Sequence, residues 1–221
     1  MTSRHLVVTL LVLVVVLLNA AFIGLGSVFD YPDILQQDAD EILQKFRANE
    51  GTIVALFTVL ALGAALLAPI AVILGRFADN DLGRWSIRVG IAAAAVQVIG
   101  LLRWPLIVPG LADDNDADTF DTVHTLLGTV VGEIFGYALT AVWTVLIIFA
   151  LGRRLAGRWF EFLGLTAAAL IALGVLVPLD VPGADFANFV GYVLWSLWLL
   201  AFAVLMWRLP GRAEGPQFVT P

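Results

Sequence analysis

Six long apolar stretches constrain this chain more than any other feature of its sequence. Crossing the hydrocarbon of a bilayer as an α-helix takes about 20 apolar residues. The stretches that meet this length are residues 6–29, 52–75, 85–109, 129–151, 160–179 and 189–206. They predict an all-α polytopic membrane protein, with a bundle of six transmembrane helices over residues 1–209 and a cytoplasmic tail at 210–221.

The composition agrees with a membrane protein rather than a soluble domain. Hydrophobic residues make up 61% of the 221 residues and charged residues only 14%, whereas soluble domains carry about a quarter charged residues. A soluble fold of this size could not cover so much apolar surface. We therefore expect the lipid bilayer to be the main partner. The net charge of −6 gives no reason to expect nucleic acid.

The first stretch also has features of a secretory signal, because Arg4 precedes an apolar run and Ala20 and Ala21 supply small residues. The run continues through Phe22 and Ile23, which makes it longer than the core of about 7–15 residues in a signal peptide. We interpret the stretch as a retained helix. Cleavage would remove one span and leave the sidedness of the others unchanged.

Basic residues alternate from loop to loop. They precede the first stretch and follow the second, fourth and sixth: Arg4; Arg76, Arg84 and Arg88; Arg153, Arg154 and Arg158; Arg208 and Arg212. The loops between them are acidic, with Lys45 and Arg47 as the only basic residues in the first of these. Because positive charge favours the cytoplasmic side, the pattern predicts that both termini lie in the cytoplasm.

The first outer loop carries a helical pattern of its own. Pro32 suits a helix start, and Leu35, Ile42, Leu43 and Phe46 recur at helical spacing. This predicts a short amphipathic helix that lies on the membrane surface or caps the bundle from outside. A helix that docks a partner protein is the alternative.

Two charged residues fall inside the predicted spans, where charge is costly unless it has a partner, water or a function. Arg103 lies about 10 Å from the outer end of the third span, and Glu133 lies about 7 Å from the same side in the fourth. The two spans are consecutive and antiparallel. Their similar depth predicts an ion pair between Arg103 and Glu133.

The fourth span supports a buried site at this depth. Gly128, Gly132, Gly136 and Thr140 form a stripe of small residues that lets another helix approach closely. A polar stripe beside it includes Glu133 and Tyr137. We expect Asn19 in the first span, Gln97 in the third and Tyr192 in the sixth to complete its inner wall.

Two readings of this cluster remain open. In one, the ion pair only fixes the register of the helices. In the other, a cavity opens outward, where Arg103 binds an anionic group or Glu133 takes and releases a proton. His124 and Asp180 would form its rim. Because His124 lies nine positions before Glu133, on the opposite side of a straight helix, we do not expect the two to touch.

No motif for an enzyme, metal or cofactor is present. The acidic loop after the third span fails the calcium-loop pattern, because Thr119 and Thr125 replace the required Gly and Glu. The absence of cysteine excludes disulfides and cysteine-ligated clusters. The two histidines lie on opposite sides of the predicted membrane, which excludes bis-His haem ligation. We therefore predict no catalytic residues, no metal and no cofactor.

Two segments resemble a bacterial membrane family that is described as a domain of unknown function, number 4386. They are Phe29-Asp30-Tyr31-Pro32-Asp33-Ile34-Leu35 and residues 132–144, which begin Gly-Glu-Ile-Phe-Gly-Tyr. In the family a His often follows the Glu, whereas Ile134 stands there in this chain. The resemblance covers most of the chain and implies a multi-helix protein of the bacterial inner membrane. It implies no activity.

The sequence thus favours a non-enzymatic membrane protein that binds or moves a small amphiphilic or anionic molecule. Its expected site residues are Arg103, Glu133, Tyr137, Asn19, Gln97 and Tyr192. The alternative is a structural or accessory subunit, or a membrane sensor, in which the Arg103–Glu133 pair is only architectural.

Overall fold

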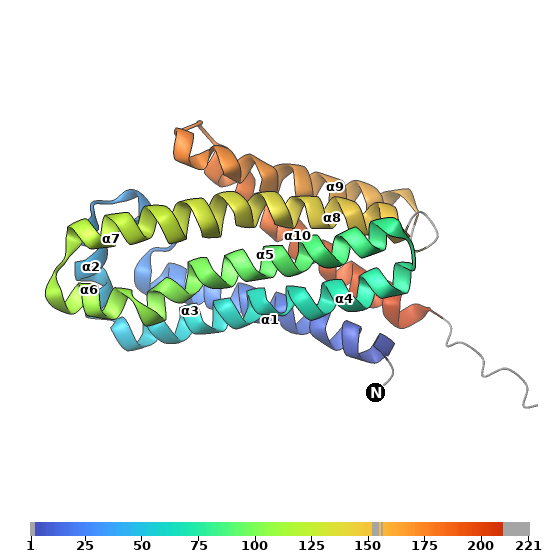
Figure 1. The fold of residues 1–221 in the computed structure, drawn as a ribbon, viewed down its shortest axis with the longest axis horizontal. Coiled ribbons are helices and arrows are strands. Elements are labelled where there is room, and N and C mark those ends of the chain that lie inside the picture. Colours follow the sequence, from blue (N-terminus) through green and yellow to red (C-terminus); the bar gives the residue numbers. More distant parts are fainter. Residues whose placement is uncertain (1–2, 152–154, 156, 210–221) are drawn as a thin grey trace, which may run out of the picture.

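The structure is a computed structural model that describes residues 3–151, 155 and 157–209. All of its regular elements are helices (Figure 1). The α-helices are α1 (Ser3–Phe29), α2 (Ala39–Ala48), α3 (Glu50–Ala65), α4 (Leu67–Ala78), α5 (Asp81–Leu106), α6 (Val108–Asp114), α7 (Ala117–Val123), α8 (Gly136–Leu151), α9 (Arg158–Leu173) and α10 (Ala184–Arg208). The 3₁₀-helices are η1 (Asp33–Gln36) and η4 (Gly174–Leu179), and η2 (His124–Phe135) is a π-helix.

The described part of the chain has six helices long and apolar enough to cross a membrane, as the sequence predicts. They are Arg4–Phe29, Glu50–Ala78, Asp81–Asp114, Ala117–Leu151, Arg158–Leu179 and Ala184–Arg208. The fourth begins twelve positions earlier than expected, because the polar residues before residue 129 continue the same helix. The predicted tail at 210–221 lies outside the described residues.

The six spans form a ring in chain order. Each span packs against the span before it and the span after it, and α10 closes the ring against α1. The Arg4 guanidinium donates a hydrogen bond to the Leu209 carbonyl, which links the two ends of the described chain. Because consecutive spans are antiparallel neighbours joined by short loops, the topology is that of an up-and-down bundle.

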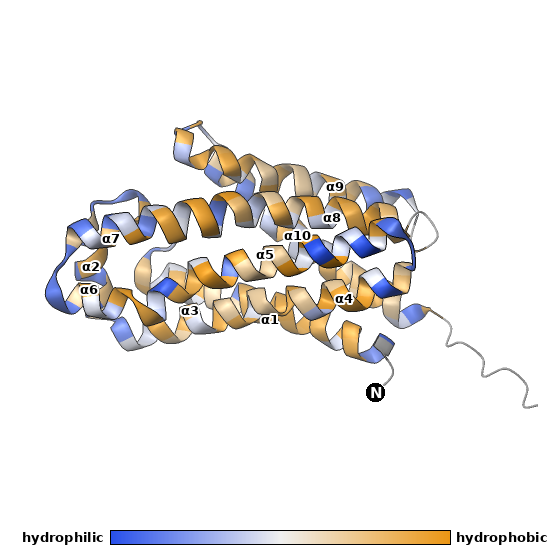
Figure 2. Cartoon of the chain, viewed as in Figure 1, coloured by the Kyte–Doolittle hydropathy of each residue, from blue (hydrophilic) through white to orange (hydrophobic). Residues whose placement is uncertain are grey.

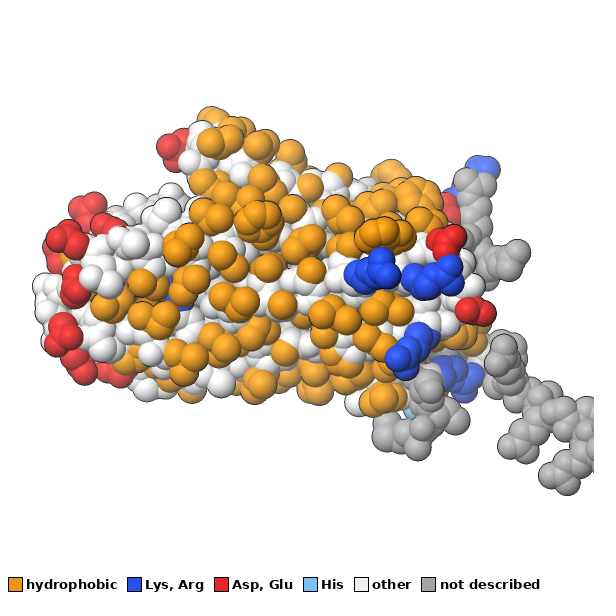
Figure 3. Space-filling view, in the orientation of Figure 1, with side chains coloured by type: hydrophobic (Ala, Val, Ile, Leu, Met, Phe, Trp, Pro, Cys, Tyr) orange, Lys and Arg blue, Asp and Glu red, His pale blue; other side chains and the backbone are white. Residues whose placement is uncertain are grey.

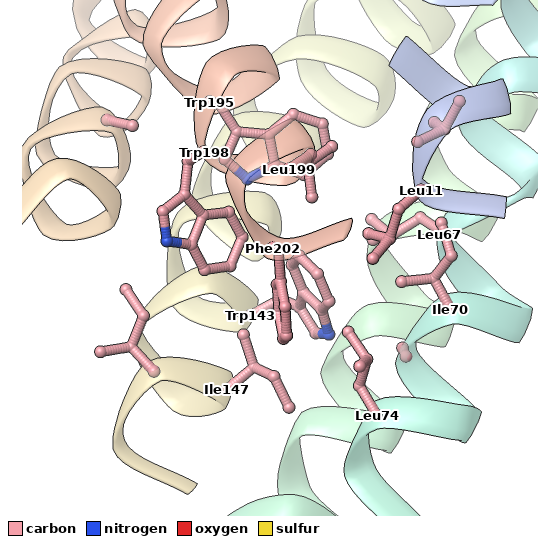
Figure 4. Close-up of a cluster of buried hydrophobic side chains, with 14 of the residues drawn as sticks. Leu11, Leu67, Ile70, Leu74, Trp143, Ile147, Trp195, Trp198, Leu199 and Phe202 are labelled. Carbon is pink, nitrogen blue, oxygen red and sulfur yellow. The ribbon is translucent and has the colours of Figure 1, made fainter. Parts of the chain in front are cut away.

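Large side chains fill the middle of the ring at the end that holds both termini (Figure 4). Trp143, Trp198 and Phe202 are fully buried there, together with Leu11 and Leu74. The Trp143 and Trp198 rings meet edge to face, with their centroids 6.2 Å apart. Buried aromatic and aliphatic side chains therefore occupy the interior of that half of the bundle.

A separate aromatic cluster closes the opposite end. Trp104 stacks on Phe57 with ring centroids 4.7 Å apart, and Phe29 meets its edge at 5.1 Å. Phe46 of α2 and Phe120 of α7 complete the cluster. We call this end, formed by α2, α6 and α7, the cap.

The predicted amphipathic helix is α2, and it caps the bundle. It begins at Ala39 rather than near Pro32. Its residues Ile42, Leu43 and Phe46 are all buried. Arg47 at its last turn donates hydrogen bonds to the Ala112 carbonyl (2.6 Å) and the Asn115 side chain (2.8 Å). A cation at the end of α6 complements the free carbonyls and the dipole of that helix.

Charge is segregated between the two ends of the bundle. Hydrophobic residues cover the long helices, and hydrophilic residues collect at the helix ends (Figure 2). Asp and Glu gather over the cap, whereas Lys and Arg gather at the opposite end with a few acids among them (Figure 3). This arrangement agrees with the pattern behind the positive-inside argument, and the cytoplasmic position of both termini stays a prediction.

We predict that the cap faces away from the cytoplasm. The chain has no cysteine, so a single introduced thiol reports its own side of the membrane. Asp113→Cys in the cap should react with a membrane-impermeant maleimide on intact cells. Asp81→Cys at the opposite end should react only after the cells are permeabilised. Labelling in the reverse order would contradict the predicted orientation.

Candidate functional site

A cavity of ≈ 890 Å³ occupies the half of the ring that lies towards the cap. Its walls come from all six spans and from the segment after α1. The residues that carry polar side chains into it are Asn19, Tyr31, Asp33, Gln36, Gln97, Arg103, Glu133, Tyr137, Asp180, Asp185, Asn188, Tyr192 and Ser196. All six residues that the sequence singled out as a site therefore line one cavity.

The cavity reaches the middle of the bundle. Along α10 it extends from Asp185 to Ser196, which is about 16 Å at the rise of an α-helix. Trp195 lies at its inner end and donates a hydrogen bond from the indole nitrogen to Thr144 Oγ1 (2.9 Å). The aromatic core in Figure 4 begins directly beyond this residue. The cavity is therefore closed towards the basic end.

Arg103 is the most buried charged residue described, at 5% exposure. Its Nη1 donates to the Gly100 carbonyl at 2.5 Å, and its guanidinium carbon lies 5.1 Å from the centroid of the Trp104 ring. Its Nε is buried without a hydrogen-bond partner among the described residues. A backbone carbonyl and an aromatic face thus replace part of its hydration, and hydrogen-bonding capacity remains.

The small-residue stripe of the fourth span shapes this site. A Cβ on Gly128 would stand 2.7 Å from the Arg103 guanidinium carbon, so only glycine leaves room for the guanidinium. One turn further in, a Cβ on Gly100 would stand 2.6 Å from the Gly132 Cα. The partner that the stripe predicts is therefore α5, and the two backbones touch beside the cavity.

The same seam continues inward with a hydrogen bond. A Cβ on Gly136 would approach the Gln97 side chain to 3.0 Å, and Gln97 Nε2 donates to Thr140 Oγ1 at 2.8 Å. Gln97 is thus fixed by the last member of the stripe. This orients a polar side chain at the cavity wall.

The predicted ion pair between Arg103 and Glu133 is wrong. Among the described residues the ion pairs within 4.0 Å are Lys45–Asp30 and Arg84–Asp81, and Glu133 has no hydrogen bond. Both charges line the cavity, but the Arg103 guanidinium turns towards the Gly128 notch and the cap. Equal depth along two helices does not fix the direction in which either side chain points. Here the notch at Gly128 determines the direction of the Arg103 side chain.

The position of His124 follows from the unusual winding of η2. A π-helix takes about 4.4 residues per turn rather than 3.6, so nine positions come to about two turns. This brings His124 round towards the α5 side, where its Nδ1 lies 3.5 Å from Arg103 Nη2. The ring also stacks on Phe120, with centroids 5.4 Å apart. His124 does not line the cavity, so its predicted place on the rim is wrong, whereas Asp180 does line the mouth.

The remaining predicted residues are held by partners of their own. Asn19 Nδ2 donates to the Val15 carbonyl (2.8 Å) and to Ser196 Oγ (3.1 Å), which joins α1 to α10. The rings of Tyr137 and Tyr192 meet edge to face at 5.9 Å. These contacts place their polar atoms around the inner part of the cavity.

Six polar lining residues were missed by the sequence analysis: Tyr31, Asp33, Gln36, Asp185, Asn188 and Ser196. Tyr31 lies in the segment after α1, and loss of solvation raises the pKa of its hydroxyl to about 12, so it is a neutral donor at any physiological pH. Asn188 near the start of α10 donates to the Ile171 carbonyl at 2.9 Å. Tyr31 lies within the segment that resembles the family, but nothing in the spacing of Asn188 indicates the cavity.

The chain was compared with family models, curated proteins and solved structures. Residues 7–203 match the family model DUF4386, a domain of unknown function. The chain belongs to this family. No curated protein and no solved structure matches it.

The site offers binding groups of several kinds. Within the described residues, no three His, Asp or Glu side chains are grouped so as to hold a metal ion. The cavity instead combines one arginine, one carboxylate and several amides and hydroxyls with an apolar wall. Such a combination can hold an organic molecule by its charged or polar end.

We predict that the DUF4386 seam tolerates no side chain at Gly100. Gly100→Ala should lower the free energy of unfolding by about 1–3 kcal/mol, because the added methyl meets backbone that cannot move aside. Gly110→Ala is the matched control, since a Cβ there meets nothing within 4 Å. Thermal unfolding of both variants in the same detergent measures the difference, and equal midpoints would contradict the close approach of α5 and η2.

Proposed function

We propose that this protein binds a small molecule with an anionic group and an apolar part in the outer half of the bundle, and that Arg103 is the residue that binds the anionic group. The observation that carries the proposal is the state of Arg103. It lines a cavity of ≈ 890 Å³ and has no carboxylate partner among the described residues.

The cavity has the size and mixed character of a ligand site. Pockets for small organic molecules measure about 300–1,000 Å³ and are mainly apolar with a few polar groups. Here the apolar wall includes Phe22, Leu101, Phe186 and Phe189, and Arg103 and Glu133 line the same cavity. A ligand with an anionic end and an apolar end matches this combination.

Glu133 has a second role in the proposal. Its carboxylate lines the cavity and has neither a hydrogen bond nor an ion pair among the described residues. It can accept a hydrogen bond from a hydroxyl or ammonium group on the ligand, or a proton. Because Glu133 forms no ion pair with Arg103, the guanidinium is available for the anion.

The packed core towards the basic end bears on transport. A cavity that ends against a packed core on the basic side is what a binding protein needs, and it is also one end state of an alternating-access carrier. The proposal that the cavity binds a ligand applies to a binding protein and to a carrier alike. We further propose that the protein resides in the bacterial inner membrane, as its sequence resemblance implies.

Binding can be tested with n-hexyl phosphate, which is water-soluble and carries both parts of the proposed ligand. In phosphatidylcholine nanodiscs, calorimetric titration should show saturable binding to the wild-type protein. Arg103→Met should weaken it about 10- to 100-fold, because a charge-assisted hydrogen bond contributes about 1.5–3 kcal/mol. n-Hexanol should bind no better to the wild type than to the variant.

The control for this experiment is Arg88→Met. Arg88 also lies on α5 and packs against a tryptophan, with its guanidinium carbon 5.0 Å from the Trp85 ring, but it is exposed outside the cavity. Its loss should leave the affinity for n-hexyl phosphate unchanged. Equal weakening by both substitutions, or no binding to the wild type, would overturn the proposal.

Glu133→Gln separates binding from a purely architectural role. Breaking a buried ion pair that holds a fold together costs about 3–5 kcal/mol. Because Glu133 makes no such pair here, we expect the variant to unfold within about 1 kcal/mol of the wild type. A loss in the range of a broken pair would instead favour the alternative, in which the protein is a structural or accessory subunit and the two charges only fix the helices.

A further inference from the structure

The seam between α1 and α10 forms one wall of the cavity. At its inner end Asn19 and Ser196 join the two helices through a hydrogen bond of 3.1 Å. Further towards the cap, Phe22 and Phe189 meet across the seam with ring centroids 6.0 Å apart. All four residues line the cavity. Between the Asn19–Ser196 hydrogen bond and the cap, α1 and α10 therefore meet through aromatic rings. This apolar contact separates the cavity from the surroundings of the bundle.

One face of α10 belongs both to the cavity and to the outer surface of the bundle. Phe186, Phe189 and Val193 line the cavity, and they are 68%, 46% and 41% exposed. Their spacing of three and four residues places them along a single stripe of the helix. The cavity thus continues to the lipid-facing side of α10.

The seam lies at the depth of the outer leaflet. The third and fourth spans are 34 and 35 residues long, or about 51–53 Å, whereas the last two have 22 and 25 residues, or about 33–38 Å. Figure 1 shows that the α9–α10 hairpin ends well short of the cap. Val193 lies about 13.5 Å from the start of α10 at Ala184, which is within one leaflet of a hydrocarbon layer about 30 Å thick.

The mouth at the end of the cavity has the wrong charge for an anion that arrives from water. Asp33, Asp180 and Asp185 line it and are all exposed, so they repel an anionic solute on approach. The α1–α10 seam carries no charged side chain at Phe22, Phe189 or Val193. An amphiphile that is already in the membrane avoids the acidic mouth.

We propose that the ligand is a single-chain anionic lipid of the outer leaflet, which enters sideways between α1 and α10 and places its head group at Arg103. Its acyl chain lies along the stripe of Phe186, Phe189 and Val193 and continues towards the bilayer. The Phe22–Phe189 contact opens for this passage. The inference rests on the proposed function, since it takes Arg103 as the anion-binding residue.

A photolabelling experiment tests where the chain lies. Lysophosphatidic acid with a diazirine in its acyl chain is mixed into phosphatidylcholine proteoliposomes and irradiated, and the adducts are mapped by mass spectrometry. Adducts should concentrate on the segment that contains Phe186, Phe189 and Val193. Arg103→Met should reduce them about tenfold or more, because the head group no longer holds the chain there.

The control position is Phe149 of α8, which is 58% exposed and does not line the cavity. Its labelling reports contact with ordinary membrane lipid and should be the same in the wild type and in Arg103→Met. Equal labelling of α10 and Phe149, or labelling of α10 that does not depend on Arg103, would overturn the lateral route.

A cross-link tests the route itself. The chain has no cysteine, so Phe22→Cys with Phe189→Cys can be joined selectively by a bis-maleimide. The closed seam should slow loading of the long-chain probe at least tenfold relative to each single variant capped with N-ethylmaleimide, which controls for the added bulk. Loading of n-hexyl phosphate should be slowed no more by the cross-link than by the caps. Long-chain loading that the cross-link does not slow, or equal slowing of both probes, would overturn the separate lipid route.

The outcomes distinguish the two proposals. If n-hexyl phosphate binds in a manner that depends on Arg103 but the long-chain probe does not concentrate at α10, the proposed function stands and the lateral route fails. If n-hexyl phosphate does not bind at all, the proposed function itself fails.

Discussion

The contact of two backbones between α5 and η2 is the constraint on which the rest of the site depends. Gly100 and Gly132 bring these helices together where any side chain would clash. One turn towards the cap, the same approach leaves the notch at Gly128 that receives Arg103. A guanidinium is costly to bury in a membrane. It persists here because a carbonyl, an aromatic face and a cavity wall surround it.

The interior of the ring is filled differently in the two halves of the bundle. Tryptophan, phenylalanine and aliphatic side chains fill the half near the termini. The other half keeps small residues and polar ends around the cavity, so collapse there would bury amides and charges without partners. The aromatic cluster of the cap braces this half from outside, and Trp104 links it directly to Arg103.

Much of the architecture could be predicted from the sequence, because apolar length and the alternation of charge act on whole segments. The six spans, the capping role of α2 and the shared location of Arg103 and Glu133 all follow from such patterns. The rotation of individual side chains did not follow. Arg103 turned away from Glu133 because the space beside Gly128 decides its direction, and no spacing rule contains that information. His124 was placed on the rim from its depth alone, whereas the winding of η2 turns its ring towards Arg103.

The winding of η2 also affects how the chain can vary in length. Over the twelve residues His124–Phe135, the difference between π and α pitch accumulates to more than half a turn. With ordinary α-helical winding, the two ends of this segment would be rotated relative to each other about the helix axis. Gly128 and Tyr137 would then no longer face the same cavity. A deletion within these residues therefore rotates the part of the helix before η2 relative to the part after it. The loss of a residue from a surface loop does not change this rotation.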